Sequence, residues 1–155
     1  MKKLAILSGI LLAPCSWGKT FAGVNLVIRS KKPTLILMHT KLLWNQWKNE
    51  FEKQTGYIPG LIGDQLFEIK DITLGLYISV NNNMKLLKDR FSLILVDEVH
   101  RCPADLFSET VNNLNAKTKI GLTATYSRKD GRHLLLPDYF SDFIVKANDW
   151  RPVKR

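Results

Sequence analysis

Residues Ala13–Thr20 have the types and spacing of a phosphate-binding loop. They follow an apolar run, Gly9–Ala13, that is typical of a strand, and they precede a predicted helix, which is the setting such a loop requires. There, backbone N–H groups converge on phosphate oxygens, while a lysine ammonium reaches the outer phosphates and a hydroxyl holds Mg²⁺. Lys19 and Thr20 stand at the positions for these two roles. The candidate loop consists of Ala13, Pro14, Cys15, Ser16, Trp17, Gly18, Lys19 and Thr20.

Two features of this loop depart from the usual pattern G-x-x-x-x-G-K-[ST]. Ala13 replaces the first glycine, and the interior carries Ser16 and the bulky Trp17. An ordinary strand-to-helix turn with a solvated lysine is therefore an alternative interpretation of the same eight residues.

Two adjacent carboxylates close an apolar run farther along the chain. Ser92–Val96 is predicted to be a buried strand, and Asp97 and Glu98 follow it directly. Ligands of open α/β sheets bind at the carboxyl ends of strands, and neighbouring residues of a strand point to opposite faces. Asp97 is therefore predicted to approach a metal ion, and Glu98 to orient and deprotonate an attacking water. His100 is either a coupling residue beside the outermost phosphate or an ordinary loop histidine.

A third motif, Gly121–Thr125, stands at another predicted strand end. Its two hydroxyl residues, Thr123 and Thr125, flank a small alanine. Hydroxyl-rich strand ends are common, so the motif alone is a weak signal. Its order and spacing after the other two motifs strengthen it.

The elements between these motifs alternate between short β-type apolar runs and longer helical patterns. This alternation predicts an α/β fold with a mostly parallel sheet flanked by helices. The expected strands are Gly9–Ala13, Thr34–His39, Tyr57–Ile62, Ile72–Val80, Ser92–Val96, Lys119–Leu122 and Phe143–Lys146. The clearest helix is Lys41–Gln54, where Trp44, Trp47 and Phe51 recur on one face. These aromatic side chains are expected in the core rather than as a stacking platform for bases.

The composition indicates one globular domain. The 155 residues are 45% hydrophobic and 24% charged, and they contain no apolar run long enough to cross a membrane. The formal net charge of +9 favours polyanionic partners such as nucleic acid. Cys15 and Cys102 lie far apart and form no metal-binding pattern, so reduced thiols and a cytoplasmic location are expected.

Residues Met1–Trp17 also have the features of an export signal. Two lysines precede the apolar run Leu4–Ala13, and Cys15 stands where a lipoprotein would be cleaved and acylated. Pro14 beside the cleavage position argues against export, and cleavage would destroy the candidate phosphate loop. Export as a lipoprotein stays a minor alternative, which predicts membrane-bound protein lacking residues 1–14.

The motifs Ala13–Thr20, Asp97–His100 and Leu122–Thr125 resemble, in order and spacing, motifs I, II and III of superfamily 2 helicases and translocases. Within that superfamily the stretch Leu95–Ala104 looks like the XPB/UvsW-like branch, many of whose members are phage or repair helicases. Thr34–Phe51 resembles motif Ia of the same branch, which grips the backbone of single-stranded DNA. The resemblance covers most of the chain. It implies a RecA-like P-loop NTPase domain, the first motor domain of an ATP-dependent DNA helicase or translocase.

The resemblance also implies roles for individual residues in an ATP site. Gly18 and Lys19 would bind the phosphates, Thr20 and Asp97 would hold Mg²⁺, and Glu98 would act as the base. These roles agree with those argued above from the residues themselves.

A second set of implied roles concerns single-stranded or branched DNA. Thr123 and Thr125 would couple ATP hydrolysis to DNA, and Thr40 and Lys41 would contact DNA phosphates. A lysine at a helix N-terminus can also be merely solvated, and that alternative stays open for Lys41. If the chain is phage-encoded, the expected location is the cytoplasm of the host.

Superfamily 2 motors have a second RecA-like domain that carries an arginine-rich motif, and no such pattern follows Gly131. We therefore assign residues 1–147 to the first motor domain and interpret residues 148–155 as an exit toward a missing second domain. Without the arginines, turnover should fall about 10³- to 10⁵-fold.

Two classes of function remain after this comparison. The first is a truncated or split motor domain, inactive alone, that needs a separately encoded second domain. The second is a non-catalytic module that binds nucleotide or DNA and regulates an intact helicase. A downstream reading frame that encodes the arginine motif is expected for the first class and not for the second.

Overall fold

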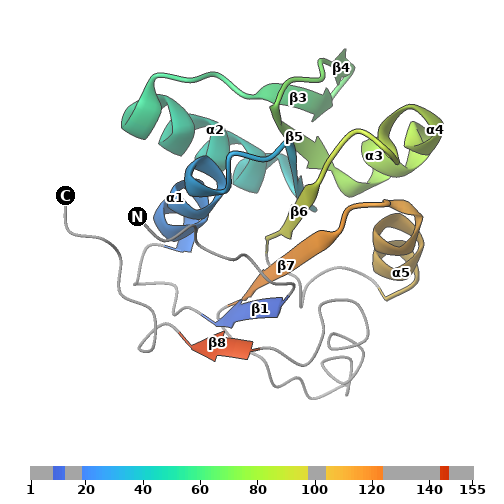
Figure 1. The fold of residues 1–155 in the computed structure, drawn as a ribbon. Helices are drawn as coiled ribbons and strands as arrows, with labels where there is room; N and C mark the ends of the chain where they lie inside the picture. The colour runs from blue at the N-terminus through green and yellow to red at the C-terminus, as the bar shows by residue number, and fades with distance from the viewer. Residues whose placement is uncertain (1–8, 13–18, 98–103, 124–143, 147–155) are drawn as a thin grey trace.

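The computed structural model describes residues 9–12, 19–97, 104–123 and 144–146, which form an α/β fold around one sheet (Figure 1). Within these residues the sheet has eight strands in the order β4-β3-β5-β2-β6-β7-β1-β8. The pair β3–β4 is antiparallel, and the other strand pairs are parallel. The strands are β1 (Gly9–Leu12), β2 (Thr34–Met38), β3 (Gly60–Gly63), β4 (Leu66–Phe67), β5 (Ile72–Leu76), β6 (Leu93–Val96), β7 (Thr118–Thr123) and β8 (Ile144–Lys146). The predicted mostly parallel α/β sheet is confirmed.

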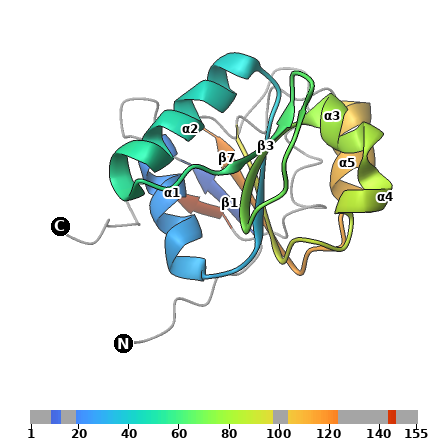
Figure 2. The same cartoon turned by 90° about the horizontal axis from the view of Figure 1, so that it is seen from above.

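Helices cover both faces of this sheet (Figure 2). The described helices are α1 (Lys19–Ser30), α2 (Lys41–Thr55), α3 (Tyr77–Asn82), α4 (Met84–Leu87) and α5 (Ala104–Asn113). Helices α1 and α2 lie together on one face, and α3, α4 and α5 lie on the other. This arrangement leaves the central strands without a solvent-facing side, which is why their sequences are continuously apolar.

The core is divided by the sheet into two layers, and strand residues alternate between them. In β2, Leu35 and Leu37 pack toward α3 and α5, whereas Ile36 and Met38 pack toward α1 and α2. This alternation follows from the two-residue period of a strand. The layer under α1 and α2 contains Val24, Val27, Ile36, Met38, Trp44, Trp47, Phe51, Leu74, Leu93, Leu95, Ile120 and Leu122.

Helix α2 has clear start and stop signals in its sequence. The Thr40 hydroxyl accepts a hydrogen bond from the backbone N–H of Leu43, 3.2 Å away, as an N-cap. Gly56 ends the helix with a left-handed φ of 72°. Between them, Trp44, Trp47 and Phe51 are buried, so the prediction that these aromatic residues belong to the core is confirmed.

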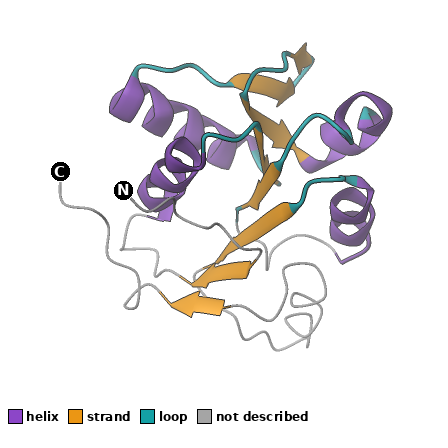
Figure 3. Cartoon of the chain, viewed as in Figure 1, coloured by secondary structure: helices purple, strands orange, loops and turns teal. Residues whose placement is uncertain are grey.

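Two predicted strands differ from the structure, and one strand of the structure is absent from the predicted set (Figure 3). The strand expected over Ile72–Val80 ends at Leu76 and continues as α3, because Tyr77 and Val80 are buried while Ile78 between them is exposed. A spacing of three residues between buried positions is helical. The strand expected over Tyr57–Ile62 begins only at Gly60, and β4 was not predicted. The turn before β4 uses positive φ at Asp64 and Gln65, without the Asn-Gly pair that marks such turns.

Among the described helices, none is both long and apolar enough to cross a membrane.

Candidate functional site

Four neighbouring strands end at the same edge of the sheet, and the three predicted motifs follow three of them. Leu12, the last residue of β1, pairs with Thr123, and Val96 of β6 pairs with both Gly121 of β7 and Leu37 of β2. In parallel strands this register places the carboxyl ends of β1, β7, β6 and β2 side by side. Ligands of open α/β sheets bind at such an edge.

The candidate phosphate loop lies between β1 and α1. The strand ends at Leu12 and the helix begins at Lys19, with Thr20 as its second residue, so the predicted strand-to-helix setting is confirmed. Residues 13–18 of the loop lie outside the described residues. A helix N-terminus directed at this edge offers backbone N–H groups and a partial positive charge to an anion.

Asp97 follows β6 directly and is 1% exposed. Its backbone N–H donates to the carbonyl oxygen of Leu37 at 2.9 Å, which extends the ladder between β6 and β2 by one residue. Its side-chain Oδ2 accepts a hydrogen bond from Trp47 Nε1 at 2.7 Å. Asp97 is therefore held through both its backbone and its carboxylate. Glu98 and His100 lie outside the described residues.

Trp47 occupies the space between this carboxylate and helix α1. The side chain is 0% exposed, and its ring lies 6.3 Å from that of Phe51, centroid to centroid. Its other neighbour is Gly23 of α1, where an added Cβ would lie only 2.3 Å from Trp47 Cη2. The close approach of α1 to α2 thus depends on a residue without a side chain at position 23.

The sequence predicts Trp47 in the core, as observed, but not its contact with Asp97. A usable signal was present, because a buried indole N–H normally finds an acceptor and Asp97 is a buried carboxylate at the site. The sequence alone did not show that Trp47 of α2 reaches the end of β6.

The residues predicted to contact DNA begin at the same edge. Thr40 comes two residues after the end of β2, and its hydroxyl caps α2. Lys41 is exposed and forms an ion pair with Asp64 in the turn between β3 and β4. Thr123 is the last residue of β7, while Thr125 lies outside the described residues. The contacts of Thr40, Lys41, Thr123 and Thr125 with DNA or nucleotide stay predictions.

The donor chemistry at this edge fits Mg²⁺. A carboxylate from Asp97 and a hydroxyl from Thr20 are oxygen donors, and nucleotide-bound Mg²⁺ takes one or two protein ligands together with phosphates and waters. In the part of the chain that the structure describes, no group of three or more His, Cys, Asp and Glu residues is placed to form a metal site of protein ligands alone. Such a protein-only cage is the arrangement that suits Zn²⁺ rather than nucleotide-bound Mg²⁺.

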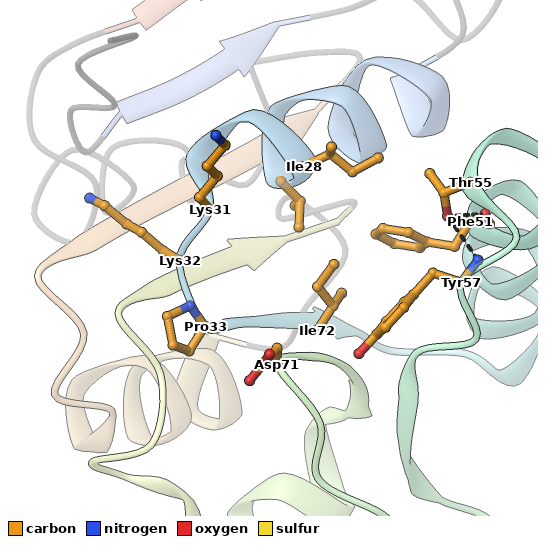
Figure 4. A pocket seen from close by; sticks show the side chains of 10 residues that line it. Ile28, Lys31, Lys32, Pro33, Phe51, Thr55, Tyr57, Asp71 and Ile72 are labelled. Carbon is orange, nitrogen blue, oxygen red and sulfur yellow. Dashed lines mark hydrogen bonds between the residues drawn. The ribbon is translucent and has the colours of Figure 1, made fainter.

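A separate apolar pocket lies at the opposite edge (Figure 4). It is formed by the end of α1, the end of α2 and the starts of β2 and β5, and Lys31 and Lys32 border it. Since phosphate-binding loops and strand carboxyl ends are at the other edge, this pocket does not belong to the candidate site.

Comparison with known proteins places this architecture in a family. The sequence model described as "Type III restriction enzyme, res subunit" matches residues 7–128. The DNA 3'-5' translocase XPB2 of Sulfurisphaera tokodaii is 36% identical over 140 residues, which are 90% of this chain and 32% of that protein. A probable helicase of Escherichia phage T5 is 32% identical over 125 residues, 80% of this chain and 28% of that protein. The chain therefore spans about a third of the length of these relatives.

Solved structures agree with this placement of the fold. The UvsW helicase from bacteriophage T4 gives a TM-score of 0.71 at 20% identity, covering 90% of this chain and 54% of that chain. The Hef helicase domain of Pyrococcus furiosus also gives 0.71, at 17% identity, covering 90% and 34%. The predicted RecA-like fold and the predicted resemblance to the XPB/UvsW-like branch are both confirmed.

Proposed function

Because this chain belongs to the family described as type III restriction enzyme, res subunit, we propose that it is the ATP-binding motor domain of an ATP-dependent DNA helicase or translocase. The observation that carries the proposal is the burial of Asp97 at the sheet edge where β1 ends and α1 begins. A buried carboxylate beside a phosphate loop is the arrangement that Mg²⁺-dependent phosphoryl transfer needs. The names of the relatives, a DNA translocase and a helicase, support the same class of activity.

In this proposal the chain binds Mg·ATP at the shared edge. Gly18, Lys19 and the loop backbone bind the phosphates, and Thr20 and Asp97 hold the metal. When bound, Mg²⁺ neutralises charge that develops on the phosphate oxygens. Glu98 orients and deprotonates the attacking water.

DNA binding is proposed for the residues that follow β2 and β7. Lys41 contacts backbone phosphates, which carry no sequence information and fix the position of the strand. Thr40 lies beside it, and Thr123 and Thr125 transmit the state of the nucleotide to DNA. The net charge of +9 favours a polyanion as the partner.

A second RecA-like domain completes the site in this proposal, whether it is separately encoded or not. Residues 1–147 act as the first domain and 148–155 lead toward the second. Phosphoryl transfer commonly needs an arginine against the transferred group, and such a residue is worth about 10³- to 10⁵-fold in turnover. We expect the 155-residue chain alone to bind nucleotide far better than it hydrolyses it.

The experiment that tests the proposal is calorimetric titration of the purified chain with Mg·ATP. Wild type is expected to bind saturably, and Lys19→Ala is expected to lose binding, because the lysine reaches the outer phosphates. Lys41→Ala is the matched control, since it also removes a lysine at the first position of a helix at this edge, and it should bind nucleotide normally. If Lys19→Ala still binds Mg·ATP, or if Lys41→Ala also loses binding, the roles assigned to these two lysines are contradicted.

A non-hydrolysing module that binds nucleotide or DNA is the second candidate. It is favoured by the departures within the phosphate loop, Ala13 for glycine and Trp17 in the interior. ATP turnover with a second helicase domain added in trans decides between the two, and Glu98→Gln should abolish that turnover while Mg·ATP binding persists. A chain that binds Mg·ATP but stays inactive with every second domain supplied would be the module.

A further inference from the structure

The hydrogen bond between Trp47 and Asp97 joins two elements that are distant in sequence. The partners are 50 residues apart, and the bond from Nε1 to Oδ2 measures 2.7 Å in a buried setting. Trp47 is 0% exposed and Asp97 is 1% exposed. Water therefore cannot readily replace either partner, so a substitution at Trp47 should change the hydrogen bonding of the Asp97 carboxylate.

An indole N–H is a suitable donor for a carboxylate that also binds a cation. It is neutral at every accessible pH and donates a single hydrogen bond. It therefore fixes the orientation of the carboxylate without cancelling its negative charge, whereas a lysine or arginine in the same place would compete with the metal. Metal-binding groups are commonly oriented in this way by a second hydrogen-bonded residue.

The position of Trp47 also connects Asp97 to the two helices at the site. Its ring is packed against Gly23 of α1, the helix that begins with Lys19. Trp47 itself belongs to α2, which begins at Lys41, where DNA contact is proposed. A shift of either helix would therefore move the donor that holds Asp97.

We propose that Trp47 is a positioning residue, which orients Asp97 for Mg²⁺ and relates that orientation to helices α1 and α2. This inference rests on the proposed function, because it assigns a role toward nucleotide-bound Mg²⁺. In this role Trp47 acts through Asp97 and not on the reacting atoms.

Trp44 provides a matched control within the same helix. It is also a buried tryptophan, 3% exposed, and its Nε1 lies 3.4 Å from the backbone carbonyl oxygen of Leu74. Its hydrogen-bond partner is in β5, not at Asp97. Replacing either tryptophan by phenylalanine removes an indole from the same layer of the core, but Trp47→Phe alone removes the donor to Asp97.

The test measures the Mg²⁺ concentration that half-saturates binding of a fixed amount of ATP. In Trp47→Phe this concentration is expected to rise about 10- to 100-fold, the usual effect of losing a residue that orients a metal ligand. In Trp44→Phe it should stay within about twofold of wild type. Binding measured in EDTA, without metal, should be alike in all three proteins.

A second replacement of Trp47 separates loss of the hydrogen bond from loss of packing. Trp47 replaced by 3-benzothienylalanine keeps both rings and substitutes sulfur for the N–H, so the shape is retained while the donor is lost. The same rise in the Mg²⁺ requirement is expected. NMR of nitrogen-15-labelled wild type gives a second readout, in which the indole N–H signal of Trp47 is the one that is absent from Trp47→Phe. This signal should shift when Mg²⁺ is added to the nucleotide-bound protein, and the signal of Trp44 should shift less.

The outcomes separate this inference from the proposed function. A wild-type chain that binds no nucleotide overturns both. Normal binding by wild type with an unchanged Mg²⁺ requirement in the benzothienyl protein overturns the role of Trp47 alone. An equal rise in Trp44→Phe also overturns it, because the effect would then come from general loosening of the core.

Discussion

Replacing Gly23 with alanine sets two physical effects against each other. Alanine is the best helix former, and in a helix interior it is favoured over glycine by about 0.8–1.0 kcal/mol. At position 23, however, the added Cβ would lie 2.3 Å from Cη2 and 3.0 Å from Cζ3 of Trp47. Ordinary carbon contacts lie at about 3.5–4.0 Å, so α1 or the ring would have to withdraw by roughly 1 Å.

The surroundings of Trp47 decide which effect prevails. The ring is 0% exposed, packs beside Phe51 and is tied to Asp97 by its N–H. Overpacking in a well-packed core typically costs about 1–3 kcal/mol, and a rigid aromatic ring with no free space lies at the upper end. We expect Gly23→Ala to lower the free energy of unfolding by about 2 kcal/mol after the helix gain is subtracted.

Urea denaturation followed by circular dichroism is the appropriate assay, because it does not depend on tryptophan fluorescence. The double variant Gly23→Ala with Trp47→Phe supplies the control, since phenylalanine lacks the distal ring atoms that the new methyl would meet. In the Trp47→Phe background the Gly23→Ala substitution should be neutral or stabilising by up to about 1 kcal/mol. Equal destabilisation in both backgrounds would refute the reasoning, and so would a stabilised single variant.

Three further predictions concern Thr40, Asp64 and Lys119. Thr40→Ala removes the N-cap of α2 and should lower the free energy of unfolding by about 1 kcal/mol in urea denaturation, whereas Thr40→Ser should retain it. Asp64→Asn removes the ion-pair partner of Lys41 and leaves the lysine free to contact DNA. Since exposed ion pairs are worth about 0.2–1 kcal/mol, the variant should bind single-stranded DNA about 1.5- to 5-fold more tightly at low salt. If a fluorescence-anisotropy titration shows no gain in affinity, Lys41 is not a DNA contact. Burial lowers the pKa of Lys119 in the folded chain below the ordinary 10.5 that it has in the unfolded chain. At pH values between the folded and the unfolded pKa, the unfolded chain therefore binds more protons, and the free energy of unfolding should rise with pH. Lys119→Met should flatten that rise in denaturation curves at successive alkaline pH values, and an unchanged slope would count against the assignment.

The sequence predicted those elements whose signals are local. The strand Thr34–Met38 is apolar from Leu35 onward because both its faces are covered, and this is visible without knowing what covers them. The helix Lys41–Thr55 carries its own cap, its own stop at Gly56 and an apolar face. The pairing of Tyr77 with Val80 on one helix face was missed because β-branched and aromatic residues in that run also favour a strand.

The residues of the candidate site are recognisable in the sequence, but the contact between Trp47 and Asp97 is not. Asp97 and Lys19 stand out in the sequence because each comes after a predicted strand in a recognisable motif. That Trp47 contacts Asp97 depends on β2 lying between β5 and β6, because the helix that follows β2 then brings Trp47 to the end of β6. Sheet order is a property of long-range pairing, and a hydrophobic pattern does not encode it directly.

The strand before the phosphate loop has neighbours that come much later in the chain. Gly9 of β1 pairs with Ile120, and Ile10 pairs with Ile144, so β1 enters the sheet between two strands that follow it at long range. Closing such long loops has an entropic cost, and contacts of this kind form slowly and late in folding. During synthesis β1 leaves the ribosome before β7 and β8, so it can pair with them only after both have been made. We therefore expect β1, which precedes the proposed nucleotide loop, to join the sheet late, so that nucleotide binding by this chain would report that the sheet is complete.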